Sequence, residues 1–170
     1  MSPKPLPKGK HTLPGSCHCK AIQFVASNVD FGMMAKCNCT LCQCKNRIGI
    51  MLGNNDIKLR TKDGSEKILN YDNVAEEAPP ELGTYAPGIR TDGGKVNMHF
   101  CKQSGADLFY SESIPVMPEN FVNVNLMALD LKSLGVDYKD VTHPEVSTYV
   151  NGLNDSWDRR KGEPFENGSW

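Results

Sequence analysis

The chain has 170 residues and a formal net charge of −1, and 39% of its residues are hydrophobic. This length favours a single domain that buries a core without disulfide staples. A near-neutral charge argues against a sequence-independent nucleic-acid binder, which is usually clearly basic. The apolar runs are far too short to span a bilayer, and the first ten residues lack the apolar stretch of a secretory signal. We therefore predict a cytoplasmic protein with no membrane and no nucleic-acid partner.

Residues 1–12 are predicted to form a flexible N-terminal arm, because prolines alternate with lysines there. Such a composition favours extended chain that packs poorly. Residues 13–140 are predicted to form one domain, followed by a polar C-terminal tail at 141–170. Within the domain, residues 73–93 are rich in proline, glycine and glutamate and are predicted to form a long loop. Loops of that length are often functional, and a plain insertion is an equal alternative.

Most of the domain is predicted to consist of short β-strands. Alternation of apolar and polar side chains, with β-branched residues among them, is typical of half-buried strands. It is clearest at residues 95–100 and is repeated at 121–126. No segment has a long amphipathic helical period, so the predicted class is mainly β, built from hairpins. Further short strands are predicted at residues 20–25, 47–52, 56–60 and 66–71.

Seven cysteines are the most informative feature of the sequence. In a reducing compartment, clustered cysteines indicate a metal site or catalysis rather than disulfides. Thiolates bind zinc tetrahedrally, and cysteines one or two residues apart can reach the same ion. A C-x-C-x-x-C triplet supplies three ligands and leaves a fourth position open, as in a catalytic zinc site. The chain has one C-x-C pair, one such triplet and two single cysteines: Cys17 and Cys19, then Cys37, Cys39 and Cys42, then Cys44 and Cys101.

Two other interpretations of the thiols stay open at this point. An iron–sulfur cluster would need four suitably placed thiolates. A redox pair is also compatible with the C-x-x-C formed by Cys39 and Cys42, although that motif usually occurs in a strand–helix unit and this segment is predicted to be β. Cys44 is interpreted as a free thiol, with a role as an alternative ligand left open. The spacing favours zinc.

Three motifs in this order resemble those of the glutathione-dependent formaldehyde-activating (GFA) family, which includes centromere protein V. They are GSCHC at 15–19, CNCTLC at 37–42 and HFCKQSGADLFY at 99–110. The resemblance covers about residues 13–130. It implies a small zinc-binding β-tent fold of short antiparallel sheets with long loops and irregular termini. It also implies a carbon–sulfur lyase that joins or separates formaldehyde and glutathione through S-hydroxymethylglutathione.

The family pattern also implies two metal sites. The fourth structural ligand should lie three residues after Cys101, where this chain has Ser104. A neutral serine hydroxyl is a poor zinc ligand beside thiolates. The structural site is therefore expected to hold zinc through three sulfurs and a water, to recruit His18 or His99, or to stay empty. Lys20 is a further departure, because the family often has glycine there. The pattern assigns the catalytic zinc to Cys37, Cys39 and Cys42, and the structural zinc to Cys17, Cys19, Cys101 and Ser104.

The predicted function is a zinc-dependent carbon–sulfur lyase that acts through the open three-cysteine zinc. Its substrate would be a glutathione adduct or a related carbonyl or hemithioacetal compound. One or two zinc ions per chain are expected, with glutathione as a candidate co-substrate. Two alternatives stay open: a zinc lyase or dehydratase that acts on a specialised metabolite without glutathione, and a non-catalytic zinc-binding interaction module. The motifs contain no evident general base, and a homodimer is compatible with the sequence.

Overall fold

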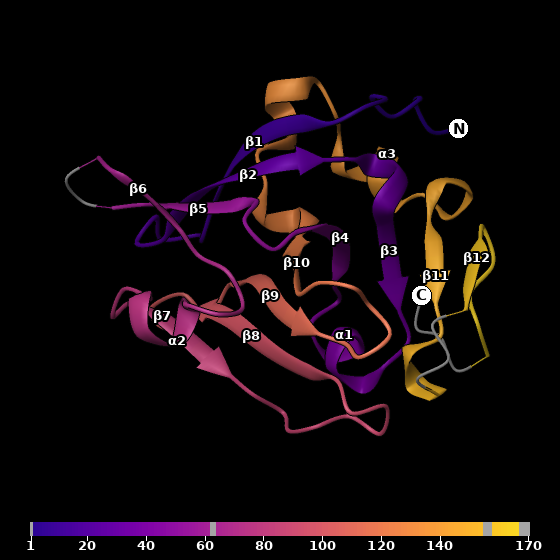
Figure 1. Cartoon of the computed structure of the whole chain (residues 1–170). Helices are drawn as coiled ribbons and strands as arrows, with labels where there is room; N and C mark the ends of the chain where they lie inside the picture. The colour runs from indigo at the N-terminus through magenta and orange to yellow at the C-terminus, as the bar shows by residue number, and fades with distance from the viewer. Residues whose placement is uncertain (1, 62–63, 155–157, 167–170) are drawn as a thin grey trace.

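The computed structural model of the chain describes residues 2–61, 64–154 and 158–166. Strands dominate this structure and form two sheets, which confirms the predicted mainly β class (Figure 1). Three short α-helices accompany them: α1 (Thr40–Cys44), α2 (Val74–Glu77) and α3 (Tyr138–Thr142). No helix in the described ranges is long and apolar enough to cross a membrane.

The smaller sheet has four antiparallel strands in the order β1-β2-β5-β6. Gly15 of the GSCHC motif lies in β1, and a Cβ atom at this position would fall 2.3 Å from the ring of Phe24. Glycine is therefore needed where the aromatic ring of β2 crosses β1. The strand bounds are β1 (His11–Ser16), β2 (Gln23–Val29), β5 (Ile57–Arg60) and β6 (Glu66–Ile68).

The larger sheet has eight strands in the order β12-β11-β3-β4-β10-β9-β8-β7. All its pairs are antiparallel except β11 with β3, which is parallel. This sheet extends across the lower half and the right side of Figure 1. The bounds are β3 (Met34–Cys37), β4 (Ile48–Gly53), β7 (Leu82–Tyr85), β8 (Lys95–Cys101), β9 (Asp107–Ser113), β10 (Phe121–Asn125), β11 (Thr148–Val150) and β12 (Arg159–Lys161).

The main core fills the space between the two sheets. It is a continuous cluster of buried apolar side chains from both sheets. Phe24 of β2 meets Phe109 of β9 edge to face, with ring centroids 6.1 Å apart. Each strand turns alternate side chains to opposite faces, so the larger sheet has a second face that points away from this core.

That second face is covered by α1. Leu41 and Cys42 of α1 pack against Val96, Met98 and Tyr110 of β8 and β9 in a separate apolar cluster. The helix therefore lies over the ends of these strands, as Figure 1 shows. This packing places the CNCTLC segment directly on the outer face of the larger sheet.

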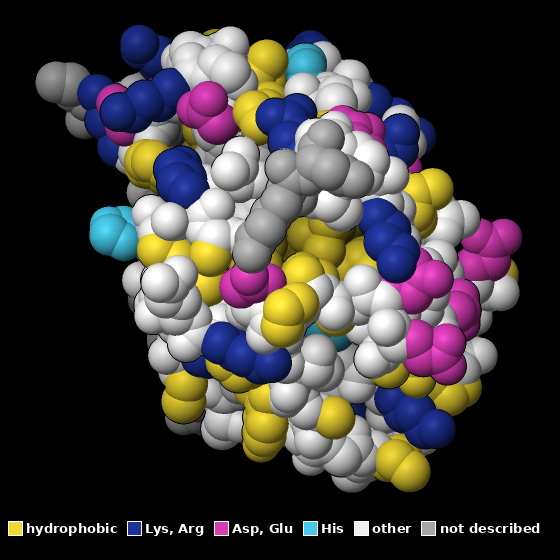
Figure 2. Space-filling view, turned by 90° about the vertical axis from the view of Figure 1, so that its left-hand side faces the viewer, with side chains coloured by type: hydrophobic (Ala, Val, Ile, Leu, Met, Phe, Trp, Pro, Cys, Tyr) yellow, Lys and Arg dark blue, Asp and Glu magenta, His cyan; other side chains and the backbone are white. Residues whose placement is uncertain are grey.

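Several elements differ from the sequence interpretation. The segment 73–93 contains α2 and β7, and Lys67 of β6 forms a 2.7 Å ion pair with Glu77 of α2. Acidic side chains gather toward one edge of the face seen in Figure 2, which is the face that looks left in Figure 1.

The segment 141–170 supplies β11 and β12 to the larger sheet, although 155–157 and 167–170 lie outside the described residues. These strands have three residues each, too few for an alternating pattern to reveal them.

A buried ion pair joins three strands of the larger sheet. Arg47, just before β4, donates from Nη1 to Asp107 Oδ2 of β9 over 2.6 Å, and both side chains are at most 6% exposed. Its Nη2 donates to the backbone oxygen and side-chain oxygen of Asn123 in β10. Its guanidinium carbon lies 3.7 Å from the ring centroid of Tyr110. Because desolvating either charge alone is costly, each residue of the pair depends on the other.

Arg47→Met is expected to destabilise the fold strongly. Removing one partner of a buried pair leaves an uncompensated charge and costs about 3–5 kcal/mol. Lys58→Met is the control, because Lys58 pairs with Glu66 at the surface and such pairs contribute about 1 kcal/mol or less. Urea unfolding of the three proteins measures the difference. Equal losses for the two variants would contradict a structural role of the buried pair.

Candidate metal centres and cavity

The CNCTLC segment brings three sulfurs together at the junction of β3 and α1. Cys37 ends β3, Cys39 caps the start of α1, and Cys42 lies within the helix. Their Sγ atoms all lie within 4.8 Å of one another. Because β3 ends at Cys37 and α1 begins three residues later, the three side chains meet at one point. We call this cluster the open triad, since it lines a cavity described below.

The open triad suits a soft divalent cation. Sulfur atoms about 2.3 Å from a tetrahedral zinc lie about 3.8 Å apart, which matches a cluster of this size. Hydrogen bonds from Cys37 and Cys42 lower the pKa of Cys39 to about 2. The pKa of Cys37 is raised chiefly by its hydrogen bond with Cys39, and that of Cys42 by its hydrogen bonds with Cys37 and Cys39; burial raises both further. A bound cation would release the protons that remain on these thiols.

Gly152 forms the back wall of the open triad. A Cβ atom here would lie 2.3 Å from Cys37 Sγ and 3.4 Å from Cys39 Cβ. The residue follows β11, which is held beside β3 by the parallel pairing of Val150 with Cys37. The side-chain amide of Asn38 also donates to the side-chain oxygen of Asn151 over 2.9 Å. The C-terminal segment is therefore part of this site, a role the sequence interpretation of a tail did not include.

The second cysteine cluster lies where β1 and the β8–β9 turn meet, and we call it the closed triad. Cys19 Sγ lies 3.5 Å from Cys17 Sγ and 3.6 Å from Cys101 Sγ, distances that fit the edges of a metal tetrahedron. The backbone N–H of Ile22 donates to Cys17 Sγ over 3.2 Å. Burial raises the pKa of Cys101, but hydrogen bonds from Ser104 and Gln103 outweigh it and lower the pKa to about 7.

Ser104 lies beside the closed triad, at the position where the family pattern has the fourth ligand. Its backbone N–H donates to Cys101 Sγ over 3.4 Å, and its hydroxyl also interacts with this sulfur. His18 is exposed and is not among the residues that gather at the cluster. His99 is fully buried, and its two ring nitrogens lie 3.0 Å from Thr84 Oγ1 and 2.9 Å from Ser111 Oγ. Neither histidine is therefore placed as the missing ligand.

Two details of the motifs have structural explanations. Lys20 has a backbone φ of 64°, in the left-handed region that glycine adopts without strain. This explains why glycine suits that position. Strand β8 has an irregularity between His99 and Phe100, so the alternation predicted for residues 95–100 holds through Met98 and then reverses. His99 is buried because it faces the main core, where its ring lies 4.8 Å from that of Phe109, and Phe100, beyond the irregularity, is only partly buried.

The structure also corrects one argument about redox chemistry. The sequence interpretation set a redox pair aside because the C-x-x-C segment was expected to be β, but Cys39 and Cys42 lie in a strand–helix unit formed by β3 and α1. That argument is wrong. What separates this cluster from a simple redox pair is its third sulfur, from Cys37, at the same point. Cys44 is exposed and lies outside both triads.

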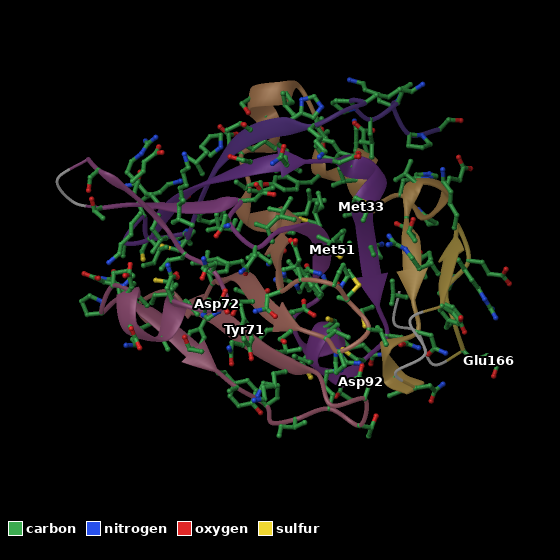
Figure 3. The ribbon with its side chains drawn as sticks, in the orientation of Figure 1. Met33, Met51, Tyr71, Asp72, Asp92 and Glu166 are labelled. Atoms are coloured by element: carbon green, nitrogen blue, oxygen red, sulfur yellow. The ribbon has the colours of Figure 1, made fainter. Side chains whose placement is uncertain are left out.

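The open triad lines a cavity of about 300 Å³ on the outer face of the larger sheet. Its floor is one face of β3, β4, β10, β9 and β8, whose residues stand side by side in the strand register. Met33 and Met51 lie close together at one end, as Figure 3 shows. The lining also includes side chains from α1, from β11 and β12, and from loops: Leu41, Val150, Arg159, Arg90, Ile114, Val116 and Met117.

Two polar side chains of β9 point into this cavity. Glu112 is 7% exposed and makes no hydrogen bond or ion pair with any described residue. Burial raises its pKa to about 7 against the opposing effect of Arg47 and Arg90. Tyr110 is 3% exposed and its hydroxyl has no hydrogen-bond partner among the described residues. Buried polar groups are normally paired, so these two are available to a ligand.

Sequence reasoning missed Glu112, because it lies outside all three cysteine motifs. The signal that could have revealed it is local. Tyr110, at the end of the third motif, and Glu112 are two residues apart, so in a strand they share one face. Glutamate is rarely fully buried unless it is paired, so a glutamate on the same strand face as Leu108 and Tyr110 is unusual at a buried position.

The chain matches the sequence profile of one family, described as glutathione-dependent formaldehyde-activating enzyme, over residues 12–152. The chain belongs to this family. The match spans most of the chain and includes both cysteine triads, and it extends to Gly152 behind the open triad. No curated protein matches the chain in sequence. Membership of the GFA family and the two triads together indicate two sites in this chain that could hold a metal ion.

Gly152→Ala is expected to disrupt the open triad selectively, because the added methyl group would overlap Cys37 Sγ. Gly32→Ala is the control: its Cβ would meet only the partly exposed side chain of Asp30, at 3.1 Å. Cobalt(II) titration, followed by thiolate-to-metal absorption, counts the sites. The first variant should bind one equivalent less than wild type and the second the same number. Full binding by Gly152→Ala would contradict the geometry given for this site.

Ser104→Cys is expected to strengthen the closed triad by adding a fourth thiolate beside Cys101. Since site formation is coupled to folding, tighter binding should appear as a higher melting temperature in the presence of zinc. Ser104→Ala is the control for loss of the hydroxyl. If Ser104→Cys changes neither zinc affinity nor melting temperature, residue 104 does not reach the metal.

Proposed function

We propose that this GFA chain is a zinc-dependent carbon–sulfur lyase that cleaves and forms hemithioacetals, with glutathione as the thiol. Cys37, Cys39 and Cys42 would hold the catalytic zinc. The observation that carries the proposal is that the open triad shares one cavity with Glu112, a buried carboxyl group without a partner in the described chain. Three thiolate ligands would leave a fourth coordination position for a substrate atom, as in catalytic zinc sites.

When bound, zinc would supply Lewis-acid polarisation of a substrate oxygen or sulfur. The protein's own contribution is to accept one proton from the substrate and to return it. In a hemithioacetal the central carbon carries both a hydroxyl group and a thioether sulfur. Glu112 as carboxylate takes the hydroxyl proton, the C–S bond breaks with its electron pair on sulfur, and the C=O bond forms. The protonated Glu112 then returns the proton to the thiolate, so that an aldehyde and a thiol leave.

Two neighbours of Glu112 orient the substrate in this proposal. The unpaired Tyr110 hydroxyl is available to donate a hydrogen bond to the substrate oxygen within the cavity. Arg47 lies against the ring of Tyr110 and bears a positive charge that is held there by Asp107. This charge lowers the pKa of Glu112 in part, while burial raises it. The balance places the pKa near 7, where a group serves equally well as proton acceptor and donor.

The closed triad has a different role in this proposal. Cys17 and Cys101 are buried, and the cluster joins β1 to the turn between β8 and β9. A metal here would fasten the two sheets together, and Ser104 would leave it with three thiolates. Such a site contributes to folding stability rather than to turnover.

Cys39→Ala tests the function directly. Exchange NMR measures how fast S-hydroxymethylglutathione interconverts with formaldehyde and glutathione. Loss of metal polarisation, worth several kcal/mol, should reduce the catalysed rate roughly a thousandfold or more. Cys44→Ala is the control, because Cys44 is exposed and outside both triads. A Cys39→Ala protein with the full catalysed rate would rule out the proposed centre.

Glu112→Gln should lower the catalysed rate by about 10²- to 10⁴-fold. In wild type the rate should rise with pH through about 7, as the Glu112 carboxylate forms, and the variant should lose this inflection. Glu119→Gln, at an exposed position, should retain it. An unchanged pH profile in Glu112→Gln would show that another group moves the proton.

The same pKa shift predicts a stability effect that is independent of turnover. Because burial raises the pKa of Glu112 from 4.5 to about 7, the folded state binds the proton more tightly than the unfolded state. This contribution is fully present below pH 4.5 and is lost as the pH rises to about 7. Glu112→Gln should therefore gain stability relative to wild type between pH 5 and pH 8 in urea unfolding.

A further inference from the structure

The cavity is much larger than formaldehyde requires. Formaldehyde has a single carbon, whereas 300 Å³ corresponds to about ten water molecules at about 30 Å³ each. A volume of this size is typical of pockets for whole small molecules. The cavity next to the open triad therefore has space for a substrate of several carbons.

The lining of the cavity is mainly apolar. Met33 and Met51 stand together at one end, as Figure 3 shows. Val116 and Met117, in the loop after β9, are 79% and 36% exposed and also line the cavity. Methionine side chains are flexible and adapt to apolar ligands of different shape. An apolar wall that includes exposed side chains indicates a ligand that is itself apolar.

Polar groups are confined to particular parts of the wall. Tyr110, Glu112 and Arg47 are buried, and they share the cavity with the open triad. Among the cations of the lining, Arg47 is already paired with Asp107 and Arg90 with Asp92. Arg159 of β12 is exposed. The buried part of the cavity thus suits a carbon skeleton with one reactive oxygen, and it does not suit the carboxylates of glutathione.

We propose that the carbonyl part of the substrate is an apolar aldehyde of several carbons rather than formaldehyde. Its carbon chain would occupy the cavity along Met33, Met51 and Val96, and its oxygen would face Tyr110 and Glu112. The charged part of the thiol would stay near the exposed Arg159. This inference rests on the proposed function and names the substrate class of the same site. The chemistry is unchanged: the C–S bond breaks, C=O forms, and the hydroxyl proton passes to sulfur.

An unreactive alcohol series tests the cavity without turnover. Binding of methanol, 1-butanol and 1-hexanol to the full chain as purified can be measured by saturation-transfer NMR. Affinity should increase about fourfold with each added methylene group, because each one leaves water for an apolar wall. An affinity that does not depend on chain length would overturn the inference.

Ala35→Leu locates the binding. Ala35 lies in β3 beside Gly49 of β4 and lines the cavity, so leucine should fill the space of about three methylene-sized groups. Affinity for 1-hexanol should fall at least about tenfold. Ala75→Leu, at an exposed position of α2, is the matched control and should bind as wild type does. If both variants bind 1-hexanol as wild type does, the ligand lies elsewhere and the inference fails.

Turnover separates this inference from the proposed function. The value of kcat/KM for the glutathione adduct of hexanal should exceed that for S-hydroxymethylglutathione. A preference for the formaldehyde adduct would overturn the inference and leave the lyase intact. A Cys39→Ala protein with undiminished turnover of both adducts would instead overturn the proposed function.

Discussion

The buried Arg47–Asp107 ion pair is the constraint on which both cysteine clusters depend. Arg47 lies three residues after α1, which carries part of the open triad, and Asp107 begins β9 after the turn that follows Cys101. Nη1 and Oδ2 lie 2.6 Å apart, out of contact with water. Neither charge is tolerable there alone, so the pair fixes the position of the two cysteine-bearing segments relative to the larger sheet. The same arginine supports the ring of Tyr110 in the cavity wall.

Much of the site was predictable because its residues are close in sequence. The spacing of Cys37, Cys39 and Cys42 allows three sulfurs to converge through local geometry alone, and the structure places them together. Gly152 could not be predicted, since it reaches Cys37 only because β11 pairs with β3. Glu112 was missed for a related reason. Its importance arises from burial in a cavity whose wall comes from five strands, and no local pattern reveals that.

In the fold, too, features set by local sequence were predictable and features set by contacts between distant segments were not. Strands with a clear alternation, such as β8 and β10, were predicted, since each has one face in a core. Strands β11 and β12 were not, and neither was the irregularity in β8 after His99. These features depend on pairing between distant segments. In the resulting account, the larger sheet separates two functions: its inner face supplies the core, and its outer face carries the open triad and the cavity.

The most direct test of this account is the metal content of the chain purified without added metal. Elemental mass spectrometry against protein concentration gives the number of ions per chain, and zinc-edge X-ray absorption gives their ligands. The account predicts zinc with sulfur neighbours at about 2.3 Å, close to two ions per chain if the three thiolates beside Ser104 suffice. One ion, lost in Cys39→Ala, would still place zinc in the open triad. Protein without zinc, and unable to take it up, would contradict the central claim.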